Sequence, residues 1–247
     1  GKIIWKRQID SQIQAPLSQL DYYKNGKLQY FFISANKLYV VDRLGRDVSG
    51  FPKVLPSNIK YSGIVDYDKS KNYRFLNALS DNNVYLLDKE GKSISEWGPK
   101  KFDNEIAFAP EHIKIGGKDY FIILLVDGTV QVFSRKGDRV SVFQMKNREQ
   151  LSGDYYVESG MTISETYLNY VSNEGVIIRQ NLNGEILSSD NLLRGKNSKF
   201  ILKRIVNREG YFIYRIDTDK IVVFDKKGQI LFENQNNGST NIYFQVV

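Results

Sequence analysis

Glycines recur along this chain at a nearly constant interval, and the interval limits the folds that the chain can adopt. Five similar turns carry a glycine at spacings of 46, 46, 47 and 44 residues, namely Gly45, Gly91, Gly137, Gly184 and Gly228. Gly1 precedes the first of them by 44 residues. A self-similar period of about 40 to 50 residues is typical of repeat architectures, in which one small structural unit is copied along the chain.

Each period contains the pattern of an antiparallel meander. An apolar run, a polar glycine turn and a second run follow one another, as in VYLLDKEGKSISEW. A further apolar segment such as YRFLNALS precedes the hairpin, and a shorter segment ending in a turn such as DYDKSKN precedes that. Four short strands per period, without the 3.6-residue periodicity of helices, indicate propeller blades. We therefore predict an all-β fold, a β-propeller with five complete four-stranded blades and a partial sixth from the terminal strands.

The two ends of the chain fit that partial sixth blade. KIIWKRQID near the N-terminus has the pattern of a last strand without its blade, and TNIYFQVV at the C-terminus that of a first strand without its blade. We expect residues 1–247 to form a single propeller domain, with repeat glycines at positions 1, 45, 91, 137, 184 and 228. The absence of an initiator methionine favours the interpretation that this domain is a fragment of a longer chain.

Aromatic residues follow most of the turn glycines: Trp5, Phe51, Trp97, Phe143 and Phe232. A ring on the last strand of a blade can fill the wedge between neighbouring blades, where a large flat side chain buries much apolar area. We expect these rings to be structural. Gly184 is followed instead by Ile186 and Leu187, which predicts looser packing or an altered blade at that position.

Composition excludes several classes of protein. Hydrophobic residues make up 41% and charged residues 26% of the 247 residues, which is ordinary for a globular chain with a large core. The longest apolar run, Tyr120 to Val126, is far shorter than the roughly 20 residues of a membrane-crossing helix, so we expect no membrane span. Cysteine is absent, which excludes a disulfide scaffold and a thiol nucleophile.

The positive net charge raises the question of a polyanionic partner. The formal charge is +7 and the isoelectric point about 9.3. However, the glycine turns and the turns on the same face hold nearly as many acids as bases, which is a pattern of solubility rather than of a basic binding face. We therefore expect no nucleic-acid partner.

Several stretches resemble known propeller repeats. GKIIWK and LLDKEGKSISEW resemble the repeats of quinoprotein-like (PQQ-like) propellers, and GIVDYDKSKNYRFLNALSDNNVYLLDKEGK resembles the FG-GAP-type repeats of bacterial cell-envelope propellers. LYVVDRLGRDVSGFPKVLP is similar to blades in large, uncharacterised envelope proteins of Bacteroidetes-type bacteria. The resemblance covers essentially the whole chain. It implies a propeller of the bacterial cell envelope, in the periplasm or at the outer-membrane surface.

The chain departs from both families at their functional residues. Quinoprotein enzymes need a tryptophan that stacks on the cofactor, and here the only two tryptophans, Trp5 and Trp97, stand at wedge positions. FG-GAP repeats often carry a calcium loop, whose nearest match here is Asp66, Asp68 and Ser70. Lys71 stands where that loop needs a glycine, so these residues are weak calcium candidates and a polar turn is the favoured interpretation. We expect no cofactor.

Catalytic signatures are hard to assemble from this sequence. His112 is the only histidine, at the start of a short strand, where we expect it to be exposed or hydrogen-bonded. A phosphate-binding glycine loop is absent, and no pair of acids stands out from the many that occupy turns. We therefore predict a protein that is not an enzyme.

The longest segments between blades are the candidates for partner contact. GPKKFDN and QMKNREQLSGDYY join basic and aromatic residues, and we predict partner-binding roles for Lys100, Lys101, Arg148, Tyr155 and Tyr156. Such residues suit a protein or a glycan. Three functions stay open: a non-catalytic binding or assembly scaffold of the bacterial envelope, a glycan-active or quinone-dependent enzyme, and a structural module of a larger surface protein. We favour the scaffold.

Overall fold

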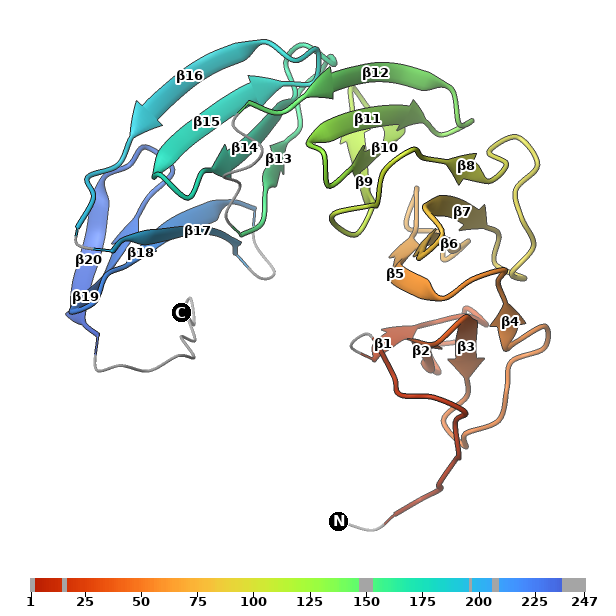
Figure 1. Ribbon diagram of the computed structural model, residues 1–247. Helices are drawn as coiled ribbons and strands as arrows, with labels where there is room; N and C mark the ends of the chain where they lie inside the picture. Colours follow the sequence, from red (N-terminus) through yellow and green to blue (C-terminus); the bar gives the residue numbers. More distant parts are fainter. Residues whose placement is uncertain (1–2, 15–16, 147–152, 196, 206–208, 237–247) are drawn as a thin grey trace. The chain divides into compact units, whose positions relative to one another are not determined.

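The computed structural model describes residues 3–14, 17–146, 153–195, 197–205 and 209–236 (Figure 1). Within these ranges the chain forms twenty β-strands and no α-helix. None of the described residues therefore belongs to a helix with the length and apolarity to cross a membrane. The prediction of an all-β chain is confirmed.

The strands form five four-stranded antiparallel sheets, each a meander of consecutive strands. The first sheet contains β1 (Ser18–Leu20), β2 (Gln29–Ser34), β3 (Lys37–Val41) and β4 (Lys53–Val54). The second contains β5 (Ile59–Val65), β6 (Arg74–Leu79), β7 (Asn83–Leu87) and β8 (Lys100–Lys101). The third contains β9 (Glu111–Ile115), β10 (Lys118–Leu124), β11 (Thr129–Ser134) and β12 (Arg139–Gln144).

The fourth sheet contains β13 (Tyr156–Glu158), β14 (Tyr167–Val171), β15 (Val176–Asn181) and β16 (Ile186–Asn191). The fifth contains β17 (Lys199–Arg204), β18 (Tyr211–Ile216), β19 (Lys220–Phe224) and β20 (Ile230–Gln235). Each of the five predicted glycine turns joins the third strand of a sheet to its fourth, so the glycine spacing correctly predicted both the number of sheets and their four-stranded plan.

The chain divides into two compact units, and the division runs through the third sheet. The first unit consists of residues 1–113, 118–127 and 131–140, which include the first two sheets. The second unit consists of residues 114–117, 128–130 and 141–247, which include the fourth and fifth sheets.

Trp97 is the central packing residue of the first unit. It is 1% exposed, and its ring lies edge-on to Phe121 of β10, with ring centroids 4.9 Å apart, and 5.8 Å from the ring of Phe133 on β11. A residue of the second sheet is thereby packed against two strands of the third. Phe51 has the equivalent role in the first sheet, since it lies edge-on to Phe75 of β6 at 5.8 Å. Both rings are structural, as predicted.

The second unit packs its sheets with one aromatic ring and one aliphatic side chain. Phe143 of β12 is 9% exposed and packs against Gly184, in the glycine turn of the fourth sheet. A Cβ atom added to Gly184 would lie only 2.8 Å from the Cβ of Phe143. Gly184 itself is followed by an outer strand, β16, whose residues are all exposed. The buried residue that follows is Leu192, which packs in a cluster with Phe200 of β17. The altered blade expected after Gly184 is thus one in which an aliphatic residue replaces the aromatic ring.

Two of the five predicted wedge rings are not buried. Trp5 is 37% exposed, and its indole Nε1 donates to the carbonyl of Arg43 at 2.9 Å. Phe232 is 49% exposed on β20. The prediction that the rings sit on the last strand is also wrong for Phe51 and Trp97, which lie in the turns just before β4 and β8. The three buried rings share a spacing of six residues from the turn glycine, whereas the two exposed rings follow at four.

The N-terminal segment is attached to the first sheet by side chains. Arg7 forms a bidentate ion pair with Asp47, at 2.7 and 3.0 Å, and Lys37 pairs with Asp10. Residues 3–10 form no strand, and TNIYFQVV lies outside the described residues. The partial sixth blade from the terminal strands therefore stays a prediction.

Replacing Trp97 by alanine should lower the free energy of unfolding by about 3 to 5 kcal/mol, because the indole leaves a cavity between two sheets. Replacing Phe232 by alanine should change it by no more than about 0.5 kcal/mol, because that ring is half exposed. Urea unfolding followed by circular dichroism measures both, since tryptophan fluorescence is altered by the first substitution. Equal losses for the two variants would contradict the assigned packing.

Candidate functional site

The predicted partner-binding lysines do not lie in a loop. Lys100 and Lys101 form β8, the outer strand of the second sheet. The Lys100 ammonium lies over the rings of Trp97 and Phe133, 5.6 and 5.9 Å from their centroids. Lys101 donates through Nζ to the carbonyl of Asp81. The loop interpretation of these two residues is therefore wrong, because a two-residue strand is too short to show an alternating pattern.

The predicted tyrosines belong to the second unit, and only one of them reaches the surface. Tyr155 is 1% exposed, so its ring cannot contact a partner, which corrects the prediction for this residue. Its carbonyl accepts from Arg204 Nε at 2.6 Å, and the Arg204 guanidinium covers its ring. Tyr156 begins β13 and lies against Tyr211 with ring centroids 5.3 Å apart. Arg148 lies outside the described residues. A binding role for Lys100, Lys101 and Tyr156 stays a prediction.

The calcium candidates form a hydrogen-bonded turn. Asp66 Oδ2 accepts from the backbone N–H of Lys71 at 3.0 Å, and Asp68 Oδ1 accepts from that of Ser70 at 3.2 Å. Lys71 adopts a φ of 62° at the position where the calcium loop has glycine, and its ammonium pairs with Asp21 at 2.6 Å. Among the described residues, no three acids, histidines or cysteines are grouped to hold a metal ion. The contacts fit the predicted polar turn.

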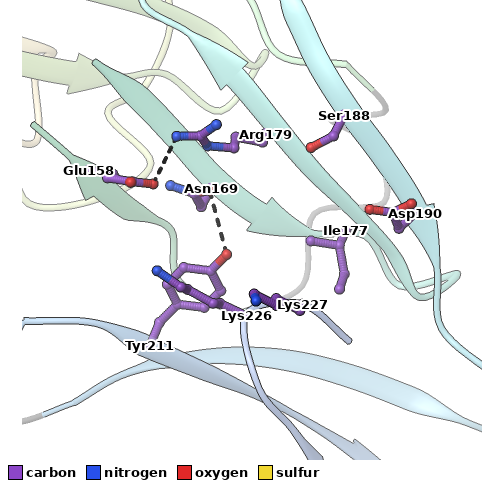
Figure 2. Close-up of a pocket in the computed structure, with 9 residues that line it drawn as sticks. All are labelled: Glu158, Asn169, Ile177, Arg179, Ser188, Asp190, Tyr211, Lys226 and Lys227. Atoms are coloured by element: carbon purple, nitrogen blue, oxygen red, sulfur yellow. Dashed lines mark hydrogen bonds and ion pairs between the residues drawn. The ribbon is translucent and has the colours of Figure 1, made fainter. Parts of the chain in front are cut away.

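A pocket in the second unit brings together polar side chains from the fourth and fifth sheets (Figure 2). We call it the polar pocket. Its volume is about 200 Å³. The lining residues are Glu158, Asn169, Ile177, Arg179, Ser188, Asp190, Tyr211, Lys226 and Lys227.

Strand register places most of these side chains on one face of the fourth sheet. Asn169 of β14 is opposite Arg179 of β15, and Arg179 is opposite Ser188 of β16. Ile177 and Asp190 form the next pair along the same face. Since alternate residues of a strand point to the same side, a polar row crosses three strands and forms the floor of the polar pocket.

Arg179 is held from two sides. Its Nη2 lies 3.3 Å from Glu158 Oε2, and its guanidinium carbon lies 3.6 Å above the ring of Tyr167. Figure 2 shows the guanidinium turned toward Glu158, and in the sheet order β14 lies between the strands that carry the two residues. A planar guanidinium stacked on a ring keeps its in-plane N–H donors directed at carboxylate groups. The two charges therefore offset one another at this end of the polar pocket.

Tyr211, on β18 of the fifth sheet, lines the polar pocket beside the polar row of the fourth sheet. Its hydroxyl donates to Asn169 Oδ1 at 3.5 Å, and Asn169 Nδ2 donates to the carbonyl of Tyr156 at 3.4 Å. Burial raises the pKa of Tyr211 to about 12, and the negative charge of Glu158 acts in the same direction. The phenol is therefore a neutral donor over the physiological range.

Lys226 and Lys227 form the opposite rim. They stand in the turn between β19 and β20, where Asp225 Oδ1 accepts from the backbone N–H of Lys227 and of Gln229, both at 2.8 Å. The next residue, Gly228, lies close to Leu192, whose Cδ2 would be 3.0 Å from a Cβ at that glycine. This contact fixes the turn against the fourth sheet. Neither lysine forms an ion pair with a carboxylate of the described residues, although Asp190 lines the same pocket.

Sequence reasoning missed this site because it looked for irregular loops between the blades. The signal that could have found it is a pair of basic residues directly before a turn glycine. Such pairs occur at Lys226–Lys227 and at Arg135–Lys136, while the other three turns have none.

Comparison with known proteins bears on the fold. No family model and no curated sequence matches the chain. The crystal structure of BBS1N in complex with ARL6DN is similar with a TM-score of 0.58 and 9% identity, over 92% of this chain and 82% of that one. BamB from Moraxella catarrhalis has a TM-score of 0.57 and 15% identity, over 95% of this chain and 65% of BamB. Dihydro-heme d1 dehydrogenase NirN in complex with DHE has a TM-score of 0.58 and 11% identity, over 85% of this chain and 45% of NirN.

These three proteins are β-propellers, and the likeness confirms the predicted fold class. At such low identity it shows the fold alone. One of the three is an enzyme by its name and another was solved with a protein partner, so the fold does not decide between catalysis and binding.

The raised pKa of Tyr211 predicts a loss of stability at alkaline pH. In the unfolded chain a tyrosine ionises near pH 10, whereas folded Tyr211 holds its proton to about pH 12. The stabilisation is therefore fully present below pH 10 and is lost as the pH rises from 10 to 12. The urea concentration at the unfolding midpoint should therefore fall between pH 8 and pH 11, and it should fall less in Tyr211→Phe than in the wild type. The exposed Tyr23→Phe is the control, and it should fall as much as the wild type. Identical falls in all three proteins would contradict the assignment.

Proposed function

We propose that this chain is a non-catalytic scaffold of the bacterial cell envelope, which binds a protein partner at the polar pocket of its second unit. The observation that supports binding is that some charged groups of the pocket are in an ion pair and others are not. Glu158 and Arg179 are paired with one another, whereas the exposed Lys226 and Lys227 form no ion pair with a described acid. Asp190 is the one further acid of the lining, so two cations face one carboxylate.

Two groups of the pocket that could act in catalysis, Glu158 and Tyr211, are engaged in structural contacts. The Glu158 carboxylate is in an ion pair, and the Tyr211 hydroxyl is bonded to Asn169 and kept protonated. A general base needs a pKa near the working pH and an unblocked approach to the proton that it removes. A recognition surface has the opposite needs, because fixed and satisfied polar groups lower the entropy lost on binding.

The structural neighbours are compatible with this proposal. BBS1N was crystallised with ARL6DN, so a propeller of related fold binds another protein. The envelope location comes from the resemblance of the repeats to bacterial envelope propellers. A glycan is the second candidate partner, because the row of Asn169, Ser188 and Asp190 offers hydrogen bonds beside the Tyr211 ring, as sugar-binding sites do.

Photo-crosslinking from two adjacent serines tests the site. Ser188 lines the polar pocket, and Ser189, its neighbour on β16, is equally exposed but points to the other face of the strand. A benzoylphenylalanine at position 188 should crosslink a protein of the native host's envelope fraction that mass spectrometry can identify, and one at position 189 should not. Equal crosslinking from both positions would place the contact elsewhere.

Reversing the two rim charges tests the energetics with the identified partner in purified form. Lys226→Glu with Lys227→Glu should weaken binding at least tenfold, since each reversal replaces an attraction by a repulsion. Lys199→Glu with Lys203→Glu changes the net charge equally at exposed positions of β17 and should leave the affinity within about twofold. Unchanged affinity of the rim variant, or turnover of a glycan that Glu158→Gln abolishes, would contradict the scaffold proposal.

A further inference from the structure

The first unit contains a second hollow, which no predicted site residue lines. We call it the basic hollow. It has a volume of about 400 Å³ and lies where the second sheet meets the glycine turn of the third. Its lining residues are Tyr67, Arg74, Ile94, Glu96, Arg135 and Lys136. Three of the six are cations and one is an acid.

Arg135 lies over an aromatic ring, and its guanidinium forms no side-chain hydrogen bond among the described residues. Its guanidinium carbon is 4.2 Å above the centroid of Tyr67. Asp119 Oδ2 is 3.8 Å away, beyond hydrogen-bond distance, and the other oxygen of Asp119 is bonded to His112 Nε2 at 2.9 Å. The side chain is 58% exposed, so the guanidinium is open to solvent and able to bind a carboxylate through two parallel hydrogen bonds.

The other two cations differ in how firmly they are held. Arg74 is anchored, since its Nη1 donates to the carbonyls of Asn72 and Tyr73 at 3.2 and 3.0 Å. Lys136 is exposed, and none of the acids that the structure describes is within ion-pairing distance of its ammonium. The hollow therefore combines two oriented guanidinium groups with one adaptable ammonium.

The preceding repeat shows which of these cations is needed for the fold. In the second sheet's glycine turn, Lys89 occupies the position of Arg135, and its ammonium lies 4.6 Å over the ring of Tyr22 in the first sheet. The cation over a tyrosine is thus a repeated packing contact. The residue after Lys89 is Glu90, whereas the residue after Arg135 is Lys136. Among the glycine turns of the first unit, only this one has a cation, Lys136, directly before the glycine. No described packing contact explains why a lysine stands there.

We propose that the basic hollow binds an acidic segment of a protein, with glutamate or aspartate carboxylates paired to Arg135 and Lys136. This inference deepens the proposed function, on which it rests, by naming a second contact and its chemistry. Ile94 provides an apolar wall for the methylene groups of acidic side chains, while the buried Tyr67 ring supports Arg135 from below. The hollow opens to solvent and does not enclose a ligand, which suits side chains presented by a larger partner.

The charge distribution argues against a nucleic acid as the occupant. Strong binding to a phosphate backbone needs cations spaced along a continuous stripe. Here Glu96 lies on the rim of the hollow, and the neighbouring turn carries Asp66 and Asp68. These acids interrupt the run of cations that a phosphate backbone needs, whereas the carboxylates of a short peptide need only the neighbouring Arg135 and Lys136.

The test is fluorescence anisotropy with a labelled peptide of alternating glutamate and leucine, in the Lys226→Glu, Lys227→Glu background that removes the rim of the polar pocket. The peptide should bind, and Lys136→Glu should weaken it at least tenfold. Arg135→Lys, which keeps the charge but loses the planar donor edge, should weaken it several-fold. Lys114→Glu, an exposed lysine of β9, is the matched control and should stay within about twofold of the background.

Four results would contradict binding of an acidic segment in the basic hollow. Equal binding of a peptide with glutamine in place of glutamate, or no effect of Lys136→Glu in a protein that still folds by circular dichroism, would overturn the inference. Tighter binding of inorganic phosphate or of single-stranded DNA than of the peptide would also overturn it. Peptide binding that vanishes once Lys226 and Lys227 are reversed would overturn the basic hollow and leave the proposed function of the polar pocket intact.

Discussion

The contact between a turn glycine and the preceding sheet sets the spacing of this fold. An ideal Cβ at Gly137 would lie 3.0 to 3.1 Å from atoms of Lys100 and Trp97, and one at Gly184 would lie 2.8 Å from Phe143. A Cβ at 3.0 to 3.1 Å is tight and one at 2.8 Å is essentially never seen, so these two turns lie close to their neighbours because they have no side chain. Gly91 has more room, since a Cβ there would lie 3.4 Å from the Lys53 side chain. At Gly137 and Gly184 the position of the glycine is therefore also the position of a close contact with the preceding sheet.

The same contact positions the residues that we assign to binding. The residue pair before Gly228 lines the polar pocket, and the pair before Gly137 lines the basic hollow. Because the glycine is pressed against the preceding sheet, the two residues before it are held at the junction of two sheets. A change of side chains at these two positions can then alter recognition without altering the packing, which is how repeat scaffolds separate fold from function.

Local patterns in the sequence predicted the architecture but not the sites. Glycine spacing and strand patterns are properties of one segment, and they correctly predicted five four-stranded sheets. Trp97 was correctly predicted to be structural, because a large ring at a repeated position near an outer strand has one favourable place to pack. The exposure of Phe232 could not be predicted, since it depends on what lies beside the fifth sheet.

The candidate sites depend on pairs of residues that are far apart in the chain. Arg135 packs on Tyr67, and Lys226 lines the same pocket as Glu158. Neither arrangement can be predicted from a local sequence pattern. Tyr155 and Tyr156 illustrate a second limit. Adjacent residues entering a strand point to opposite faces, so one is buried and the other partly exposed. The position at which β13 begins decides which of the two is buried.

The most direct test of the account is a comparison of two glycine-to-alanine substitutions in the second unit. Gly184 and Gly117 both have positive φ, 92° and 77°, so alanine strains the backbone at either position. Only Gly184 has a neighbour, Phe143, within contact of the new methyl group, since nothing lies within 4 Å of a Cβ at Gly117. If the glycine contact sets the fold, Gly184→Ala should lower the free energy of unfolding by about 1 to 3 kcal/mol more than Gly117→Ala in urea unfolding. Equal losses would show that the glycines serve only the turns and would contradict the account.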